Sequence, residues 1–294
     1  MGREVSSTLS ESKKLVRQKE LRAKIIAYFL LTLGAVTMIL PFLWMAATSL
    51  KELDAIYVQP KNWIQMFVPT SFIVQNYVKA FQVVPFARFY FNSIFVAVCV
   101  TIGQVFTSSL AAYAFARLQF PGRDKIFFAY LATMMIPGSV TMIPVFILMK
   151  LFNWIDTYKA LIIPAIFTAY GTFMLRQFFM TLPRDLEDAA KIDGCSFFGI
   201  YWKIILPLSK PAIATLTTFT FMGNWGSFMW PLVVTNTMKM RTLPIGLESF
   251  KTLYSTDWNL LMAGSVMAML PIIIIFIFNQ RYFIEGVKLT GIKG

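Results

Sequence analysis

One polar stretch between two long apolar segments holds the residues best suited to chemistry in this chain. Asp185, Glu187 and Asp188 lie close together, and Asp193 and Gly194 follow them. Carboxylates are favoured in the first turn of a helix, where the backbone dipole attracts negative charge. Glycine just past the last turn adopts the left-handed conformation that ends many helices. The stretch therefore predicts a short, charged helix that is suited to binding another molecule rather than to catalysis.

A second short helix is predicted directly after the first. Ser196 is a candidate N-cap, the helix would run from Phe197 to Ile204, and Pro207 would end or kink it. The two helices and the glycine between them connect the fourth and fifth apolar segments. Two interpretations fit this composition equally well, a surface for another protein or an amphipathic helix that rests on the lipid.

Other kinds of site find little support in the residue types. The chain has no histidine, and its two cysteines, Cys99 and Cys195, are far apart, so we expect neither a metal site nor a disulfide. The sequence contains no G-x-x-x-x-G-K-[ST] loop of the kind that holds nucleotide phosphates. We therefore expect no catalytic residue, metal ligand or bound cofactor here, and any ATP hydrolysis would belong to a separate chain.

Six long apolar segments must position this polar stretch. Apolar residues make up 57% of the 294 and charged residues 14%, against about 25% charged in soluble domains. Since roughly 20 apolar residues cross the hydrocarbon core as a helix, the sequence predicts an all-α integral membrane protein with about six transmembrane helices. The fourth segment is short and holds Pro164 and Gly171, so it should begin near Thr157 or continue to Phe179. The six segments are Lys24–Ser49, Phe89–Ala116, Ile126–Met149, Ala160–Leu175, Ile204–Val234 and Leu260–Gln280.

The basic residues predict which ends face the cytosol. With both termini inside, the cytosolic segments hold 18 of the 27 lysines and arginines, as the positive-inside rule favours. Residues 1–24 then form a basic cytosolic segment that is not cleaved, residues 25–280 the membrane domain with its polar motif at 183–207, and residues 281–294 a cytosolic tail. Because the positive charge is spread over loops that flank the membrane, the sequence does not indicate a nucleic-acid binder.

The apolar segments carry almost no charge of their own. Lys210 is the one ionisable residue clearly inside a segment, and it lies near the cytosolic end. Transporters driven by ion gradients usually carry carboxylates or histidines within the membrane, although interrupted helices can bind sodium through backbone carbonyls. An ion-coupled secondary carrier therefore stays as the alternative to a protein that is powered by a partner.

The motifs of the polar stretch resemble those of a known family. Glu187–Gly194 followed by Ile204–Pro211 is similar to the coupling motif of permease subunits in binding-protein-dependent ATP-binding-cassette importers, with Asp188 where that motif has its leading glutamate. Further segments resemble, in the same order, the smaller permease subunit of maltose-type sugar importers. These segments are Asn92–Ala97, Ala111–Arg123, Asn224–Leu232, Leu243–Leu247 and Gln280–Gly294.

The resemblance implies a set of partners. It implies a bacterial cytoplasmic (inner) membrane, a homologous second permease chain as heterodimer partner, two copies of a cytosolic ATPase that bind ATP and Mg, and an extracytoplasmic binding protein. The substrate would be a carbohydrate, either neutral or acidic, such as a uronate oligosaccharide or a sugar phosphate. Lys293 and Gly294 would reach toward the ATPase. The residues implied for coupling are Glu187, Asp188, Ala189, Ala190, Asp193, Gly194 and Ser196.

A substrate pathway is expected along the fourth and fifth segments. Aromatic faces stack on sugar rings, and amides satisfy sugar hydroxyls. Aromatics near the outer end of a span are usually belt residues at the membrane interface, and those in the middle of a helix are usually packing residues. The candidates are Tyr170, Phe221, Asn224, Trp225 and Phe228.

Overall fold

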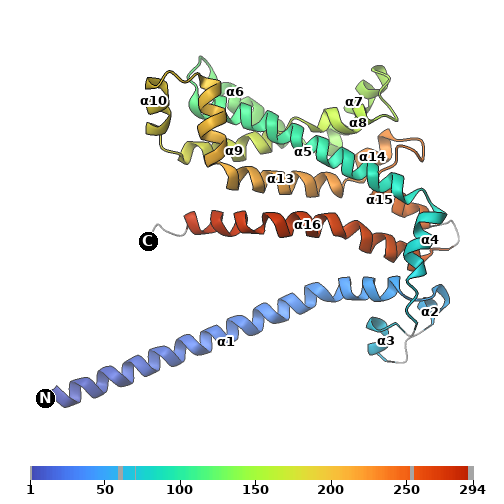
Figure 1. Cartoon of the computed structure of the whole chain (residues 1–294), viewed down its shortest axis with the longest axis horizontal. Helices are drawn as coiled ribbons and strands as arrows, with labels where there is room; N and C mark the ends of the chain where they lie inside the picture. The colour runs from blue at the N-terminus through green and yellow to red at the C-terminus, as the bar shows by residue number, and fades with distance from the viewer. Residues whose placement is uncertain (1, 59–61, 70, 252–254, 291–294) are drawn as a thin grey trace.

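The chain forms a bundle of helices. A computed structural model describes residues 2–58, 62–69, 71–251 and 255–290, with side chains described between residues 17 and 280. Within these ranges the regular structure is helical, apart from a single antiparallel bridge between Lys251 and Thr256. Figure 1 shows long helices running side by side, with short helices gathered at both ends. The prediction of an all-α protein is confirmed.

Four helical segments are long and apolar enough to cross a membrane, or six if each of two bent pairs counts as one span. Six spans agree with the sequence prediction. The fourth span runs over Tyr158–Thr181, so it both begins near Thr157 and continues past Phe179. The spans are built from α1 (Gly2–Ser49), α5 (Phe86–Arg117), α6 (Arg123–Ala132) with η1 (Thr133–Met135) and α7 (Gly138–Leu151), α8 (Tyr158–Ile162) with η2 (Ile163–Ala165) and α9 (Ala169–Thr181), α11 (Phe197–Ile200) with η3 (Tyr201–Ile205), α12 (Leu206–Leu208) and α13 (Lys210–Trp225), and α16 (Trp258–Thr290).

Prolines lie next to both bends, Pro137 at the first, and Pro207 and Pro211 on either side of the second. The third span turns by 98° between Met135 and Gly138, where Ile136 is extended because it precedes Pro137. The fifth span turns by 79° between α12 and α13. Pro207 was expected to end or kink the helix, but the helix continues through it to Leu208. The π-helical turn of η3 precedes Pro207 and widens the helix where the proline cannot donate a hydrogen bond.

The bundle is organised around α5. This helix packs against α9 and α13, α13 packs against α16, and α16 packs against α1 and α4 (Gln75–Val83). Figure 1 shows α5 and α13 next to each other, while α1 diverges from the bundle toward the N-terminus. The most apolar window of α1 has 0% of its residues buried within the chain. That surface is left for lipid or for another protein.

The fourth span is interrupted, and α5 satisfies the backbone groups that the interruption frees. Gln104 Nε2 donates to the carbonyl of Ala165 at 2.7 Å, and Thr107 Oγ1 donates to the carbonyl of Ile166 at 2.9 Å. Gln104 Oε1 also accepts a hydrogen bond from Thr220 of α13. In lipid an unpaired carbonyl costs several kcal/mol, so these polar side chains allow the break between η2 and α9.

Buried asparagines tie the elements together at the end of the bundle away from α10 (Asp185–Ile192). Asn76 Nδ2 donates to the carbonyls of Ser49 at 2.9 Å and Lys51 at 2.8 Å. Asn259 Nδ2 donates to Asn76 Oδ1 at 3.1 Å. The network joins the end of α1, the start of α4 and the start of α16. The short helices α2 (Leu53–Tyr57), α3 (Ile64–Phe67), α14 (Met229–Val234), α15 (Leu243–Leu247) and η4 (Glu248–Phe250) lie at this same end.

The carboxylate of Asp156 holds two loops together at this end. It accepts hydrogen bonds from the backbone N–H groups of Asn236 at 2.8 Å and Thr237 at 3.0 Å, and from the Thr237 hydroxyl at 2.7 Å. Burial alone would raise the pKa of Asp156, but the hydrogen bonds from Thr237 and Asn236 outweigh it and hold the pKa below its usual value. The carboxylate therefore stays charged at neutral pH and fixes the loop that leads into α8.

Gly246 is the site of a close approach between α15 and α5. A Cβ added there would lie 2.1 Å from Phe89 Cδ2, and Phe89 is fully buried. We expect Gly246→Ala to destabilise the protein by about 1–3 kcal/mol, because the ring has no room to move. Thermal unfolding in detergent measures this, with Gly223→Ala as control because no atom lies within 4 Å of its added Cβ. An unfolding midpoint equal to that of the unchanged protein would contradict the prediction.

Candidate functional site

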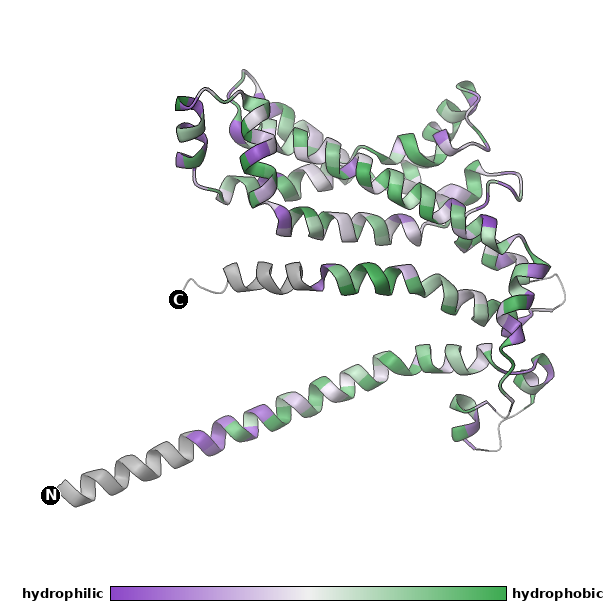
Figure 2. Cartoon of the chain, viewed as in Figure 1, coloured by the Kyte–Doolittle hydropathy of each residue, from purple (hydrophilic) through white to green (hydrophobic). Residues whose placement is uncertain are grey.

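The charged helix predicted from the sequence is α10, which stands at one end of the bundle (Figure 1). Asp185, Glu187 and Asp188 occupy its first turn, as the dipole argument requires. Figure 2 shows purple hydrophilic and green hydrophobic residues interleaved along this helix. In Figure 1 both chain ends point toward the same end of the bundle as α10.

Gly194 ends α10 in the way that was predicted. Its φ is +78°, in the left-handed region. The N–H of Cys195 donates to the carbonyl of Ala190 at 2.9 Å, and the N–H of Gly194 donates to the carbonyl of Lys191 at 3.0 Å. This pair of bonds is a Schellman motif. Ala190 and Cys195 also pack in the same apolar cluster, so the turn holds α10 at a fixed angle to the following helix.

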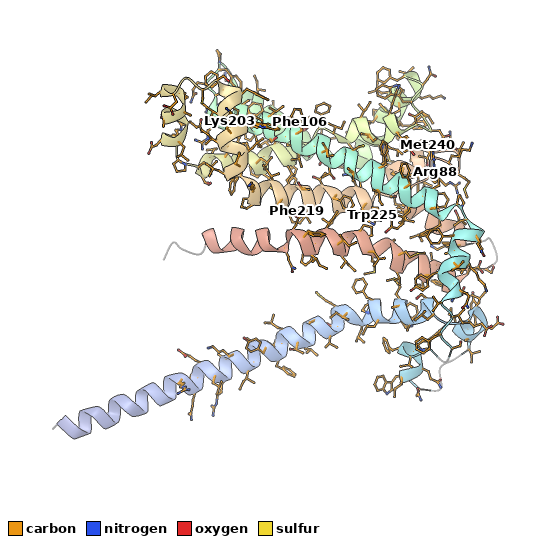
Figure 3. The ribbon with its side chains drawn as sticks, in the orientation of Figure 1. Arg88, Phe106, Lys203, Phe219, Trp225 and Met240 are labelled. Atoms are coloured by element: carbon orange, nitrogen blue, oxygen red, sulfur yellow. The ribbon has the colours of Figure 1, made fainter. Side chains whose placement is uncertain are left out.

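The second short helix also begins where predicted. Ser196 Oγ accepts a hydrogen bond from the backbone N–H of Gly199 at 3.2 Å, which confirms it as the N-cap of α11. Tyr201 behind it is buried and pairs its hydroxyl with Ser109 Oγ of α5 at 2.8 Å. Figure 3 places Lys203 at this end of the bundle and Arg88 and Met240 at the opposite end.

The two faces of α10 differ. Ala190 and Glu187 are buried against the bundle, while Asp188, Ala189 and Asp193 face outward with Gly194 and Ser196. Among the described side chains, the ion-pair partner of Asp188 is Lys191 of its own helix, at 2.9 Å on the surface. The exposed face also carries large apolar side chains, on α10 and on the helix after it. They are Leu186 at 44% exposure, Ile192 at 87%, Phe197 at 60% and Phe198 at 61%.

Glu187 is the one charged residue of the predicted coupling set that points inward. Its carboxylate lies 3.0 Å from Nε of Arg117, and the two side chains are 7% and 3% exposed. The sequence prediction grouped it with the outward-facing residues because neighbouring acids look alike in a sequence. Arg117 itself was missed as a partner, although it is the last residue of α5 and lies within a segment that carries the family resemblance.

The predicted pathway residues do not form one surface. Phe221 and Trp225 are buried at 5% and 3% exposure, stacked on each other with ring centroids 5.8 Å apart, and Trp225 Nε1 donates to the carbonyl of Ala268 at 2.9 Å. Both belong to the core, so the expectation of exposed stacking faces is corrected for them. Tyr170 is 45% exposed, and Asn224 and Phe228 are half-buried. Lys293 and Gly294, predicted to reach the ATPase, lie outside the described residues.

The chain is a multi-pass α-helical bundle with a polar helix in a loop at one end. This architecture is typical of membrane transport subunits. Residues 104–289 match the family model described as "Binding-protein-dependent transport system inner membrane component", and the chain belongs to this family. It is therefore a permease subunit and does not itself catalyse a reaction; ATP hydrolysis belongs to a separate subunit.

Individual relatives point the same way. The chain is 40% identical to the arabinooligosaccharides transport system permease protein AraQ of Halalkalibacterium halodurans, covering 78% of this chain and 82% of the relative. It is 33% identical to the sn-glycerol-3-phosphate transport system permease protein UgpE of Agrobacterium fabrum, covering 91% and 97%. Its fold is similar to a chain in the crystal structure of a bacterial ABC transporter involved in the import of the acidic polysaccharide alginate, with a TM-score of 0.79, 23% identity and coverage of 88% and 95%.

Proposed function

We propose that this chain forms half of a translocation pathway for an oligosaccharide and that α10 is the surface on which a cytosolic ATPase docks. The observation that supports this most directly is the exposure of Ile192 on the outward face of α10, whose other face packs against the bundle. Ile192 is 87% exposed, and the Schellman turn at Gly194 fixes where it points. One such side chain alone would mean little, but Ile192 is accompanied by the exposed Leu186, Phe197 and Phe198, and exposed apolar surface rimmed by polar residues is typical of a protein contact.

The charge of α10 favours a protein partner over the lipid surface. From its N-cap Arg184 to its C-cap Asp193, α10 carries four acidic residues, Asp185, Glu187, Asp188 and Asp193, and two basic residues, Arg184 and Lys191. Helices that lie on anionic headgroups instead carry lysine and arginine on their polar face. An acidic helix with two exposed apolar residues, Leu186 and Ile192, therefore suits a basic or neutral cleft of a soluble protein.

Both ends of the chain lie on the side of α10 in Figure 1, which supports a common cytosolic side for the termini and the docking helix. The excess of basic residues in these segments agrees with that orientation. The family description speaks of an inner membrane component, which supports the bacterial cytoplasmic (inner) membrane as the location.

We also propose three partners for this chain: a second permease chain, an extracytoplasmic binding protein and the ATPase. The apolar window of α1 has no buried residue, which supports a homologous second permease chain in a heterodimer. A related alginate importer has been solved in complex with an oligosaccharide-bound periplasmic protein, and the relative AraQ is named for arabinooligosaccharides. An extracytoplasmic binding protein would deliver the substrate here as well, and two ATPase copies would bind ATP and Mg.

Reconstitution tests this function. The chain is co-expressed with its second permease, placed with the ATPase in liposomes, and supplied with a binding protein and a labelled arabinooligosaccharide. We expect uptake that requires ATP and the ATPase and that survives ionophores. Uptake by this chain alone that is abolished by ionophores would instead establish an ion-coupled carrier.

A further inference from the structure

A buried ion pair connects α10 to the membrane helices. Arg117 is the last residue of α5, and Glu187 lies in the first turn of α10. Their Nε and Oε1 atoms are 3.0 Å apart. Neither atom has a hydrogen-bond partner elsewhere in the described part of the chain. Each charge therefore depends on the other for its compensation, since a buried charge without a partner is strongly unfavourable.

Arg117 holds a third element as well. Its guanidinium donates to the carbonyls of Phe179 and Leu182, the latter at 2.7 Å, where α9 ends. The last carbonyls of a helix have no partner within it, and arginine supplies several donors in one rigid plane. A single side chain thus joins the ends of α5 and α9 to the start of α10.

Apolar side chains seal this joint. Ala190 of α10 packs in one cluster with Ala112 and Ala116 of α5 and Phe179 of α9. Their burial excludes water, which strengthens the attraction between the paired charges. Small alanines on both sides let the helices approach closely around the pair.

We propose that Arg117 and Glu187 form a pin, an ion pair that makes α10, α5 and α9 move as one rigid body. A displacement of α10 then displaces α5 and α9 by the same amount. This inference rests on the proposed function, in which the ATPase moves α10. It gives Glu187 a different task from its neighbour Asp188, which is exposed and free to meet the ATPase. The two residues of the pin are positioning residues, because they act through the helices they join.

The first test measures substrate transported per ATP hydrolysed in the complete reconstituted transporter, with a labelled arabinooligosaccharide as probe. We expect Glu187→Gln to lower this ratio about tenfold, within the usual range of coupling between sites, while ATP hydrolysis continues. Arg117→Lys keeps the charge and should give an intermediate ratio. Asp124→Asn is the control, because it removes the carboxylate of an exposed ion pair with Arg123 at the start of α6, outside α10, and should leave the ratio unchanged.

A purely structural role predicts a different result, namely less assembled transporter with an unchanged ratio. That outcome, or equal ratios for Glu187→Gln and Asp124→Asn, would overturn the pin. If the unchanged transporter shows no ATP-dependent uptake, the proposed function fails instead, and the second test still decides the pin.

The second test needs no substrate, and its main comparison keeps the Arg117–Glu187 ion pair intact. Spin labels are attached at Gln119, just past the end of α5, and at Asp185 of α10, both exposed, after Cys99 and Cys195 are replaced by serine. We expect the same distance distribution between the labels in the nucleotide-free and ATP-bound transporter. A broader distribution is expected with Glu187→Gln. A shift between the two nucleotide states with the native pair present would overturn the proposal.

Discussion

Replacing Gly194 by valine should leave ATP hydrolysis running while transport falls about tenfold or more, as a shift of roughly 1.4 kcal/mol in the docking-competent state would produce. The backbone at this position has a φ of +78°, a conformation that costs residues with a Cβ roughly 1–2 kcal/mol and is least compatible with β-branched side chains. No atom lies within 4 Å of a Cβ added there. The effect would therefore come from the backbone conformation alone, which releases the Schellman turn and the direction of α10.

Gly194→Asn is the control for this experiment, because asparagine tolerates the left-handed region far better than valine. Its uptake and its ATP hydrolysis should both stay near those of the unchanged transporter. The two activities are measured side by side in liposomes that contain the full transporter. Equal transport by the valine and asparagine variants would show that the turn does not govern coupling.

Replacing Trp225 by alanine should destabilise the chain by about 3–5 kcal/mol, the usual cost of removing a buried large aromatic side chain. The indole is 3% exposed, lies between Phe221 and Tyr90 with ring centroids 5.8 and 5.5 Å away, and donates a hydrogen bond to Ala268. Its loss opens a cavity between α13, α5 and α16. Denaturant titration of the detergent-solubilised chain, or its yield after mild heating, measures the change.

Two further variants separate packing from substrate contact. Trp225→Phe keeps most of the ring and should leave the substrate concentration for half-maximal transport unchanged. Tyr170→Ala removes a ring that is 45% exposed and should change stability by no more than about 0.5 kcal/mol, so any change in that concentration would report on the pathway. A weaker substrate affinity in Trp225→Phe at unchanged stability would indicate that Trp225 contacts the substrate.

The spans and the polar loop could be predicted because each rests on local chemistry. Long apolar runs have few alternatives to membrane helices, and this prediction of six is confirmed with each bent pair taken as one span. The stop at Gly194 and the cap at Ser196 depend on residues only a few positions apart, and both are confirmed. Such local signals can be read from the sequence because they do not depend on contacts with residues far along the chain.

The features that were missed depend on contacts distant in sequence. Glu187 and Asp188 are adjacent acids, and only the packing of α10 on α5 turns the first toward Arg117, 70 positions earlier. Phe221 and Trp225 lie one helical turn apart, and nothing in their spacing says whether the stripe faces a pathway or the core. The helix continues through Pro207 because a π-helical turn absorbs the proline, a solution that sequence patterns do not reveal. Which exposed residues touch the ATPase or the substrate stays a prediction.

The asparagine network at the end of α1 has a consequence for the order of biosynthesis. Asn76 fixes the end of α1, and its side-chain oxygen receives the amide of Asn259, a residue made 183 positions later. The helix α1 therefore lacks its contact with α16 until the ribosome has synthesised α16. Until then the end of α1 is held by the hydrogen bonds from Asn76. The hydrogen bond from Asn259 forms after α16 has been made.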